Sequence, residues 1–153
     1  MAAACQALLL AWPLAAQADP VREAIDEIGR LLARDAAAVA PGAHRYEIQA
    51  DASFPCSLVL IERYRFQDKD WIRYYHLQLE DLEPGTLLAS RDRRRAIGFR
   101  AQVRYPSGQM REFSPQRIHN VRLRLGNPKN AGKIRRLLAG AIRDCRERNG
   151  FGD

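Results

Sequence analysis

The side chains that could carry chemistry in this sequence are three histidines, three cysteines and a large excess of arginine. The histidines, His44, His76 and His119, are scattered and lack the spacing of metal ligands. The sequence contains no C-x-x-C, G-x-S-x-G or H-E-x-x-H motif and no glycine-rich phosphate loop. It therefore predicts no catalytic residue, no metal site and no cofactor.

The carboxylates do not form an evident acid–base pair either. Asp68 and Asp70 flank an expected turn, where solvated aspartates are common. Glu80 and Asp81 are adjacent in the chain, so their side chains point apart. An enzyme stays open only as an alternative without a recognisable motif.

The cysteines favour a disulfide over a reactive thiol. Cys5 lies in the leader described below, which leaves Cys56 and Cys145, separated by 89 residues. An even number of cysteines in an oxidising compartment predicts a disulfide. Closing a loop of that length stabilises a fold by about 4 to 5 kcal/mol in the chain-entropy description. Two independent buried thiols are the alternative.

Residues 1–18 have the order of a secretory signal peptide. They hold no charged side chain, an apolar run from Leu8 to Leu14, and then Ala16-Gln17-Ala18, an A-x-A cleavage site. No Lys or Arg precedes the run, which an upstream start codon would explain. The alternative is a buried helix or a membrane anchor, although an anchor needs about 20 apolar residues. We expect a signal peptide over 1–18, one domain over 19–153 without a transmembrane span, and a periplasmic or secreted protein.

Positive charge is concentrated in the second half of the chain. The formal net charge is +7, and arginine outnumbers lysine by 22 to 3. Residues 19–90 carry 8 basic and 13 acidic side chains, whereas residues 91–153 carry 17 basic and 5 acidic ones. The second half is therefore where we expect an anionic ligand to bind.

Arginines at alternate positions of the expected strands are predicted to share one solvent-facing surface, since side chains alternate across a strand. Guanidinium groups match the oxygens of phosphate, carboxylate and sulfate groups. The alternative is a solvated arginine-coated face without a ligand. The candidate ligand-binding residues are Arg63, Arg65, Arg100, Arg104, Arg122 and Arg124.

The expected partner is an anionic component of the cell envelope, such as a lipid headgroup or an acidic glycan, or an acidic protein. Nucleic acid fits the charge, but export argues against it. The basic residues are also not interleaved with aromatic ones as in a nucleic-acid-binding module.

Two amphipathic helices are expected at the ends of the domain. Asp19 and Pro20 are typical of a helix start, and the helix should end at residues 41–42. Asn127 and Pro128 start the second helix, which should end at residues 149–150. The second helix carries Cys145 on its apolar stripe and can bring this thiol to the sheet.

Between residues 44 and 125 the apolar residues alternate with a period of two, which indicates strands. Turns are expected at 67–70, 83–85 and 106–108, and short strands at 87–89, 97–105 and 121–125 among others. The expected fold is therefore α+β, with an N-terminal helix, an antiparallel meander of about six or seven strands, and a C-terminal amphipathic helix.

A meander closed by one C-terminal helix resembles the pleckstrin-homology superfold, a bent sheet or half barrel. Residues 75–85, YHLQLEDLEPG, are similar to a strand-then-turn stretch of some such domains. The resemblance covers about residues 44–148, and it implies binding of anionic headgroups or peptides, although a fold alone does not carry a function. A cystatin-like helix on a curved sheet is the alternative.

We therefore expect a small, monomeric, exported domain that binds or scaffolds a partner and is not an enzyme. The alternative is a cell-envelope enzyme or an enzyme inhibitor without a recognisable motif. A histidine and a carboxylate within hydrogen-bond distance in a deep pocket would favour the enzyme, and an exposed apolar loop would favour the inhibitor.

Overall fold

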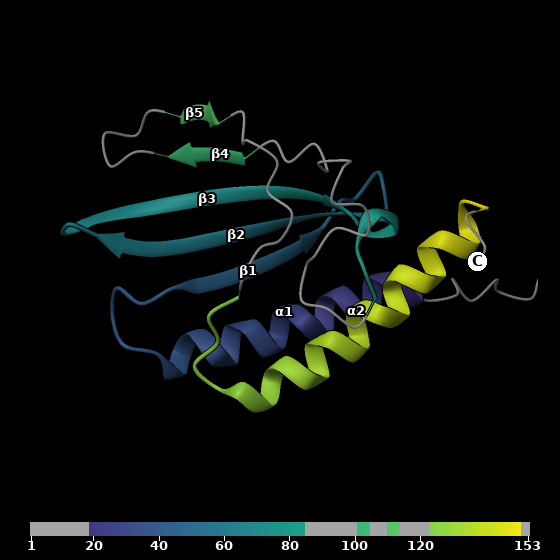
Figure 1. The fold of residues 1–153 in the computed structure, drawn as a ribbon, viewed down its shortest axis with the longest axis horizontal. Coiled ribbons are helices and arrows are strands. Elements are labelled where there is room, and N and C mark those ends of the chain that lie inside the picture. Colours follow the sequence, from purple (N-terminus) through teal and green to yellow (C-terminus); the bar gives the residue numbers. More distant parts are fainter. Residues whose placement is uncertain (1–18, 85–100, 105–109, 114–122, 151–153) are drawn as a thin grey trace, which may run out of the picture.

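The computed structural model of the chain describes residues 19–84, 101–104, 110–113 and 123–150, and of the two short internal segments only the backbone. Two helices lie beside an antiparallel sheet (Figure 1). The elements in chain order are α1 (Pro20–Ala38), β1 (Arg45–Ala50), β2 (Ser57–Phe66), β3 (Lys69–Gln78), the short 3₁₀ helix η1 (Leu79–Asp81), β4 (Ala101–Arg104), β5 (Met110–Phe113) and α2 (Pro128–Arg148).

The sheet is open and its five described strands follow the chain order, so that β1 and β5 form its edges. β2 and β3 are ten residues long and pair along their whole length, from Ser57 opposite Gln78 to Phe66 opposite Lys69. β4 and β5 are four residues each. The long pair β2–β3 is thus the backbone of the sheet.

Both helices begin where their capping residues predict. The Asp19 side chain accepts a hydrogen bond from the Val21 amide at 3.0 Å, and the Asn127 side chain accepts one from the Lys129 amide at 3.0 Å. These bonds satisfy amide donors that the first turn of a helix leaves free. α2 ends at Arg148 with Asn149 as its C-cap, and Gly150 follows in the left-handed region with a φ of +73°.

One hydrophobic core joins the helices to the sheet. α1 packs along β1, and α2 packs along α1 and η1. The inner face of the sheet consists of alternate positions of β1–β3 that enter this core with both helices. Its fully buried members include Ile25 and Ile28 of α1, Leu60 of β2, and Leu138 and Ile142 of α2.

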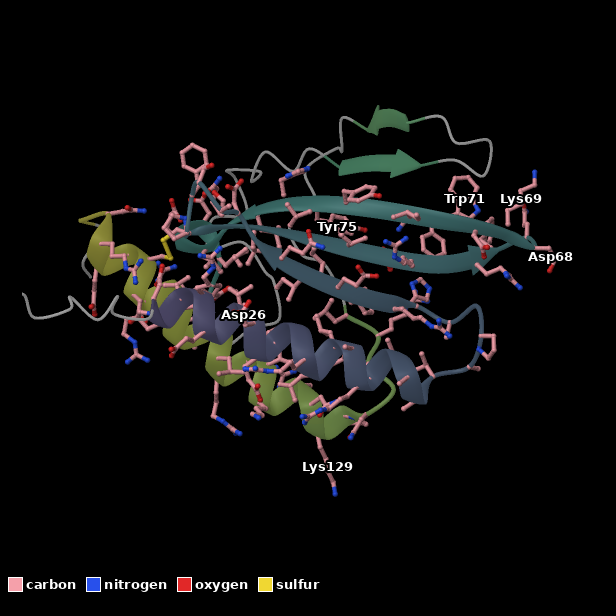
Figure 2. All side chains as sticks on the ribbon, turned by 180° about the vertical axis from the view of Figure 1, so that it is seen from behind. Asp26, Asp68, Lys69, Trp71, Tyr75 and Lys129 are labelled. Atoms are coloured by element: carbon pink, nitrogen blue, oxygen red, sulfur yellow. A yellow bond between two sulfur atoms is a disulfide. The ribbon has the colours of Figure 1, made fainter. Side chains whose placement is uncertain are left out.

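The Cys56–Cys145 disulfide is present and joins the residue before β2 to the last turns of α2 (the yellow bond in Figure 2). Cys145 is fully buried on the apolar stripe of α2, as its position in the sequence predicts. The bond therefore staples the C-terminal helix to the sheet.

The β2–β3 hairpin turns through two residues, Gln67 and Asp68, with φ values of +51° and +56°. Two left-handed residues in a two-residue loop match the right-handed twist of the flanking strands. The turn is tighter than the expected span 67–70, and Lys69 already belongs to β3. Figure 2 shows Asp68 and Lys69 at the tip of the hairpin.

The α+β class is confirmed, but the meander of six or seven strands in a half barrel is wrong. Five strands occur in the described part of the chain, and two helices pack against one another beside an open sheet. The cystatin-like alternative, with one helix on the sheet, does not describe this pair either. The strands expected at 87–89 and 97–100 lie outside the described residues.

The strand expected at 121–125 fails for a physical reason within its described part, residues 123–125. Leu123 and Leu125 are partly buried against the core but belong to no strand. The segment is held by a hydrogen bond from the Arg124 amide to the Tyr46 hydroxyl at 3.1 Å, instead of a strand ladder. An extended segment with one buried side produces the same alternation as a strand.

Among the described residues, neither helix is long and apolar enough to pass through a membrane.

Candidate anion-binding surface

The arginines predicted on β2 are already paired with carboxylates. Arg63 Nε donates to Glu47 Oε1 of β1 at 2.8 Å, and Arg65 Nε donates to Asp70 Oδ1 of β3 at 3.0 Å. The bond to Asp70 raises the pKa of the Arg65 guanidinium. Both pairs are solvent-exposed, where an ion pair contributes little to stability. The carboxylates nevertheless cancel much of the positive charge that an anion would meet here.

The other predicted arginines are placed only in part. Arg100 and Arg122 lie outside the described residues, and the Arg104 backbone belongs to β4. The register places Arg104 and Arg63 on either side of Ile72 in one row across the sheet. Of the predicted ligand-binding arginines, the structure thus places the backbones of Arg63 and Arg104 in one row of the sheet.

Arg124 lies apart from that row. Its guanidinium donates to His44 Nε2 at 3.3 Å, beside the start of β1, and its amide donates to Tyr46, which belongs to the inner face of the sheet. Arg63 pairs with Glu47, which alternates with Tyr46 and points to the outer face. Arg124 and Arg63 therefore do not share one face.

A buried carboxylate organises this end of the inner face. Glu62 is only 6% exposed, and it accepts hydrogen bonds from His44 Nδ1 at 2.7 Å, the Tyr46 hydroxyl at 3.3 Å and the Tyr75 hydroxyl at 3.0 Å. The Arg73 guanidinium lies 3.6 Å away. Three hydrogen-bond donors and one nearby cation thus offset the cost of burying the carboxylate.

The two tyrosines of this cluster hold their protons tightly. Burial, and next the negative charge of Glu62, raise the pKa of Tyr75 to about 12. Burial also raises the pKa of Tyr46 to about 12, against a lowering effect of the hydrogen bond from the Arg124 amide. Both hydroxyls therefore stay neutral donors to the carboxylate at physiological pH.

The contacts of His44 decide its tautomer. A guanidinium has only donors, so His44 Nε2 must accept from Arg124 and the ring proton must sit on Nδ1, facing Glu62. The ring also stacks on Tyr64, with centroids 5.0 Å apart. A histidine and a carboxylate are thus within reach, but both ring nitrogens are already engaged within the fold, by Glu62 and by Arg124. We interpret the cluster as a structural network.

The outward face of α2 carries cations of a different kind. Lys129, Arg136 and Arg143 recur every seven residues, so they fall on one line along the helix. All three are exposed, and within the described part of the chain their side chains form no ion pair or hydrogen bond. Figure 2 shows Lys129 pointing away from the sheet. We call these three residues the α2 basic stripe.

Three other basic residues of α2, Lys133, Arg146 and Arg148, are used within the fold. Arg146 is buried and donates to the carbonyl oxygens of Glu80 and Leu82 at 3.1 and 2.7 Å. Arg148 pairs with Asp19, and this bond is the main cause that lowers the pKa of the Asp19 carboxyl. These contacts hold α2 against η1 and the start of α1.

Lys133 also lies outside the stripe, because it pairs with Glu27 of α1. Hydrogen bonds from Lys133 and then from Arg30 lower the pKa of Glu27. Figure 2 labels the Asp26 side chain that precedes this residue on α1. The stripe thus differs from Lys133, Arg146 and Arg148 by having no partner in the described part of the chain. Arg135 is also exposed and without a partner there, but it lies off the line of the stripe.

A shallow hollow of about 310 Å³ opens beside the disulfide. The side-chain oxygen Glu80 Oε2 is buried without a hydrogen-bond donor among the described residues, while Asn149 Nδ2 donates to Glu80 Oε1 at a long 3.3 Å. Phe54, at the mouth, is 66% exposed. The lining residues are Phe54, Pro55, Cys56, Ser57, Gln78, Glu80, Arg148 and Asn149.

The basic stripe was not predicted from the sequence, although its signal is there. Lys129, Arg136 and Arg143 have helical spacing and fall within the expected second helix. The sequence alone does not show which arginines a carboxylate neutralises, since Arg63 of β2 pairs with Glu47 on the neighbouring strand β1. Only the folded structure shows which arginines form ion pairs with carboxylates.

No group of three or more His, Cys, Asp or Glu side chains is placed to hold a metal ion in the described ranges. No family model, curated protein or solved structure matches the chain. The resemblance to the pleckstrin-homology superfold therefore stays a prediction.

Proposed function

We propose that the protein is an exported, disulfide-stapled binding domain that recognises an anionic partner through the basic stripe of α2 and catalyses no reaction. The observation that carries the proposal is the row of three exposed cations that have no carboxylate partner among the described residues. Attraction of an anion to such a row costs no existing ion pair. The arginines of β2 would have to give up Glu47 and Asp70 first.

Two observations support export to the periplasm or the medium. The disulfide uses the only two cysteines that follow residue 18, and disulfides persist in oxidising compartments. The first helix begins at Pro20 with Asp19 as its cap, so cleavage after Ala18 would leave this helix and its cap intact. The partner would then be an anionic envelope component or an acidic protein.

The export part is tested by the intact mass of the protein purified from its native host. We expect a chain that begins at Asp19 and gains the mass of two hydrogens on reduction. An uncleaved chain with free thiols would contradict export, and cytosolic polyanions would then be the probes to test first.

The binding part is tested by neutralising the stripe. The variant Lys129→Gln/Arg136→Gln/Arg143→Gln loses three charges, and at about 1 kcal/mol per cation near an anionic surface its affinity for anionic vesicles or a sulfated polysaccharide should fall roughly 100-fold.

A matched control is available for that test. The variant Arg30→Gln/Arg63→Gln/Arg65→Gln has the same net charge, but each of its arginines is paired with a carboxylate. We expect this control to bind nearly as well as the unmodified protein. Equal losses in both variants would show that only net charge matters, and no loss in either would overturn the proposed function.

A second candidate, an inhibitor of an envelope enzyme, is favoured by one feature, the presentation of Phe54. The Asp51 carboxylate accepts from the amides of Ser53 and Phe54 at 2.8 and 3.2 Å, and the Phe54 carbonyl accepts from the Ser57 amide at 2.8 Å. A structured loop thus holds a large apolar side chain in solvent, as an inhibitor that inserts a residue would require.

The inhibitor candidate is tested by comparing two exposed phenylalanines in a pull-down from envelope extract. Phe54→Ala should abolish capture of an enzyme, whereas Phe66→Ala at the hairpin, where Phe66 is also exposed, should not. Capture that survives Phe54→Ala would remove this candidate.

A further inference from the structure

We infer that the occupant of the basic stripe is a linear acidic polysaccharide, whose carboxylate or sulfate groups contact Lys129, Arg136 and Arg143 in turn. The inference rests on the proposed function and adds the class of partner. Seven residues of α-helix advance about 10.5 Å, so the three cations span about 21 Å along one line. A row of that shape suits a chain with regularly repeated charges.

The small residues beside the cations indicate how closely the chain could approach. Gly132, Ala139 and Gly140 lie on the same face of α2 as the basic stripe. A Cβ atom added at Gly132 or Gly140 would meet nothing within 4 Å, so packing inside the protein does not require either glycine. Glycine inside a helix is unfavourable relative to alanine. Gly132 and Gly140 therefore leave an open track between the basic side chains.

That track favours a thin chain over a membrane surface. A flat surface would meet the ends of the long basic side chains and would not reach the backbone at Gly132 or Gly140. A helix that lies in a membrane interface also needs large apolar side chains. On this face of α2, all of whose residues are described, the residues between the cations are small or charged.

The same composition argues against a protein partner. Protein interfaces obtain most of their affinity from a few buried aromatic or other large anchors. The face has long basic side chains and open backbone instead, which suit charge-assisted hydrogen bonds to carboxylate and sulfate oxygens. The face ends at the exposed Glu147, one turn after Arg143, so a polyanion would stop there.

The test fills the track without changing the charge. In Gly132→Gln/Gly140→Gln, two neutral side chains that favour helix replace the glycines, and the melting temperature should rise. The control Ala33→Gln/Ala37→Gln adds the same side chains at exposed positions of α1. Each protein is titrated with a sulfated polysaccharide, vesicles rich in phosphatidylglycerol, and a single-stranded oligonucleotide.

We expect the glycine variant to lose at least an order of magnitude in affinity for the polysaccharide. Its binding to vesicles, which is weaker, should be unchanged. The α1 control should match the unmodified protein in both measurements. Unchanged polysaccharide affinity in the glycine variant would overturn the inference, as would tighter binding of vesicles or of the oligonucleotide. If neutralising the stripe still weakens binding in that case, the proposed function stands and only the occupant is wrong.

Discussion

The carboxylate of Asp35, near the end of α1, accepts a hydrogen bond at 2.9 Å from the amide of Gly126, which lies 91 residues later in the chain. The other oxygen of Asp35 accepts from the Asn127 amide at 2.8 Å, although Asp35 is only 4% exposed. One buried side chain thus holds the segment that leads into α2. The position of the basic stripe on α2 therefore depends on these two hydrogen bonds to Asp35.

Gly126→Ala should destabilise the protein, because a Cβ atom at this position would lie 2.5 Å from Val39 Cγ1. We expect a loss of about 1 to 3 kcal/mol in the free energy of unfolding, as for other overpacked sites. Urea denaturation measures it, with Gly132→Ala as the control, which should gain about 1 kcal/mol or slightly less. An unchanged free energy of unfolding for Gly126→Ala would show that the contact between Gly126 and Val39 is looser than described.

Glu62→Leu should be strongly destabilising. It removes the carboxylate that accepts hydrogen bonds from His44, Tyr46 and Tyr75, and breaking such a network costs about 3 kcal/mol or more. The exposed pair partner Glu47 supplies the control, since Glu47→Leu should cost less than about 1 kcal/mol. Similar losses in the two variants would contradict the network.

The tyrosines should ionise in separate phases on alkaline titration followed by ultraviolet absorbance. Tyr46 and Tyr75, each with a pKa raised to about 12, should ionise later than an ordinary tyrosine. Because the folded state keeps their protons, the stabilisation is complete below the unfolded pKa of about 10 and is lost as the pH rises through about 12.

Two variants assign that late phase. Tyr46→Phe and Tyr75→Phe should each remove part of it, whereas Tyr74→Phe, which leaves Glu62 its donors, should not. A single phase near the ordinary value in the folded protein would refute the burial of these hydroxyls.

Loss of the disulfide should cost about 4 kcal/mol of stability, because the bond closes a loop of 89 residues. The double variant Cys56→Ser/Cys145→Ser isolates this effect, with reduced unmodified protein as a second measurement. We expect α2 to lose hydrogen-exchange protection before β2 and β3. If the amides of α2 were equally protected in the oxidised protein and in Cys56→Ser/Cys145→Ser, the hydrophobic core alone would hold α2 in place.

The helices and the disulfide could be predicted because their signals are local or leave few choices. Asp19 and Asn127 cap their helices with their own side chains, and the two cysteines that follow residue 18 allow one pairing. The strand count could not be predicted in the same way, because Leu125 alternates like a strand residue while distant hydrogen bonds to Asp35 and Tyr46 hold its segment.

The candidate site was harder to predict for an electrostatic reason. Arginines at alternate strand positions predicted an anion-binding surface on the sheet. Whether an arginine is available to bind an anion, however, depends on the carboxylates that folding brings beside it. Arg65 meets Asp70 across the hairpin, whereas Arg136 meets none in the described part of the chain. That difference exists only in three dimensions.

The most direct test of the account is the salt dependence of binding to a sulfated polysaccharide, measured for the unmodified protein and for the variant with Lys129, Arg136 and Arg143 replaced by Gln. Binding to a polyanion releases counterions, so the slope of log affinity against log salt should fall by roughly one for each cation removed from the contact. We predict a clearly shallower slope and weaker binding for this variant. An unchanged slope with unchanged affinity would contradict a binding surface on α2.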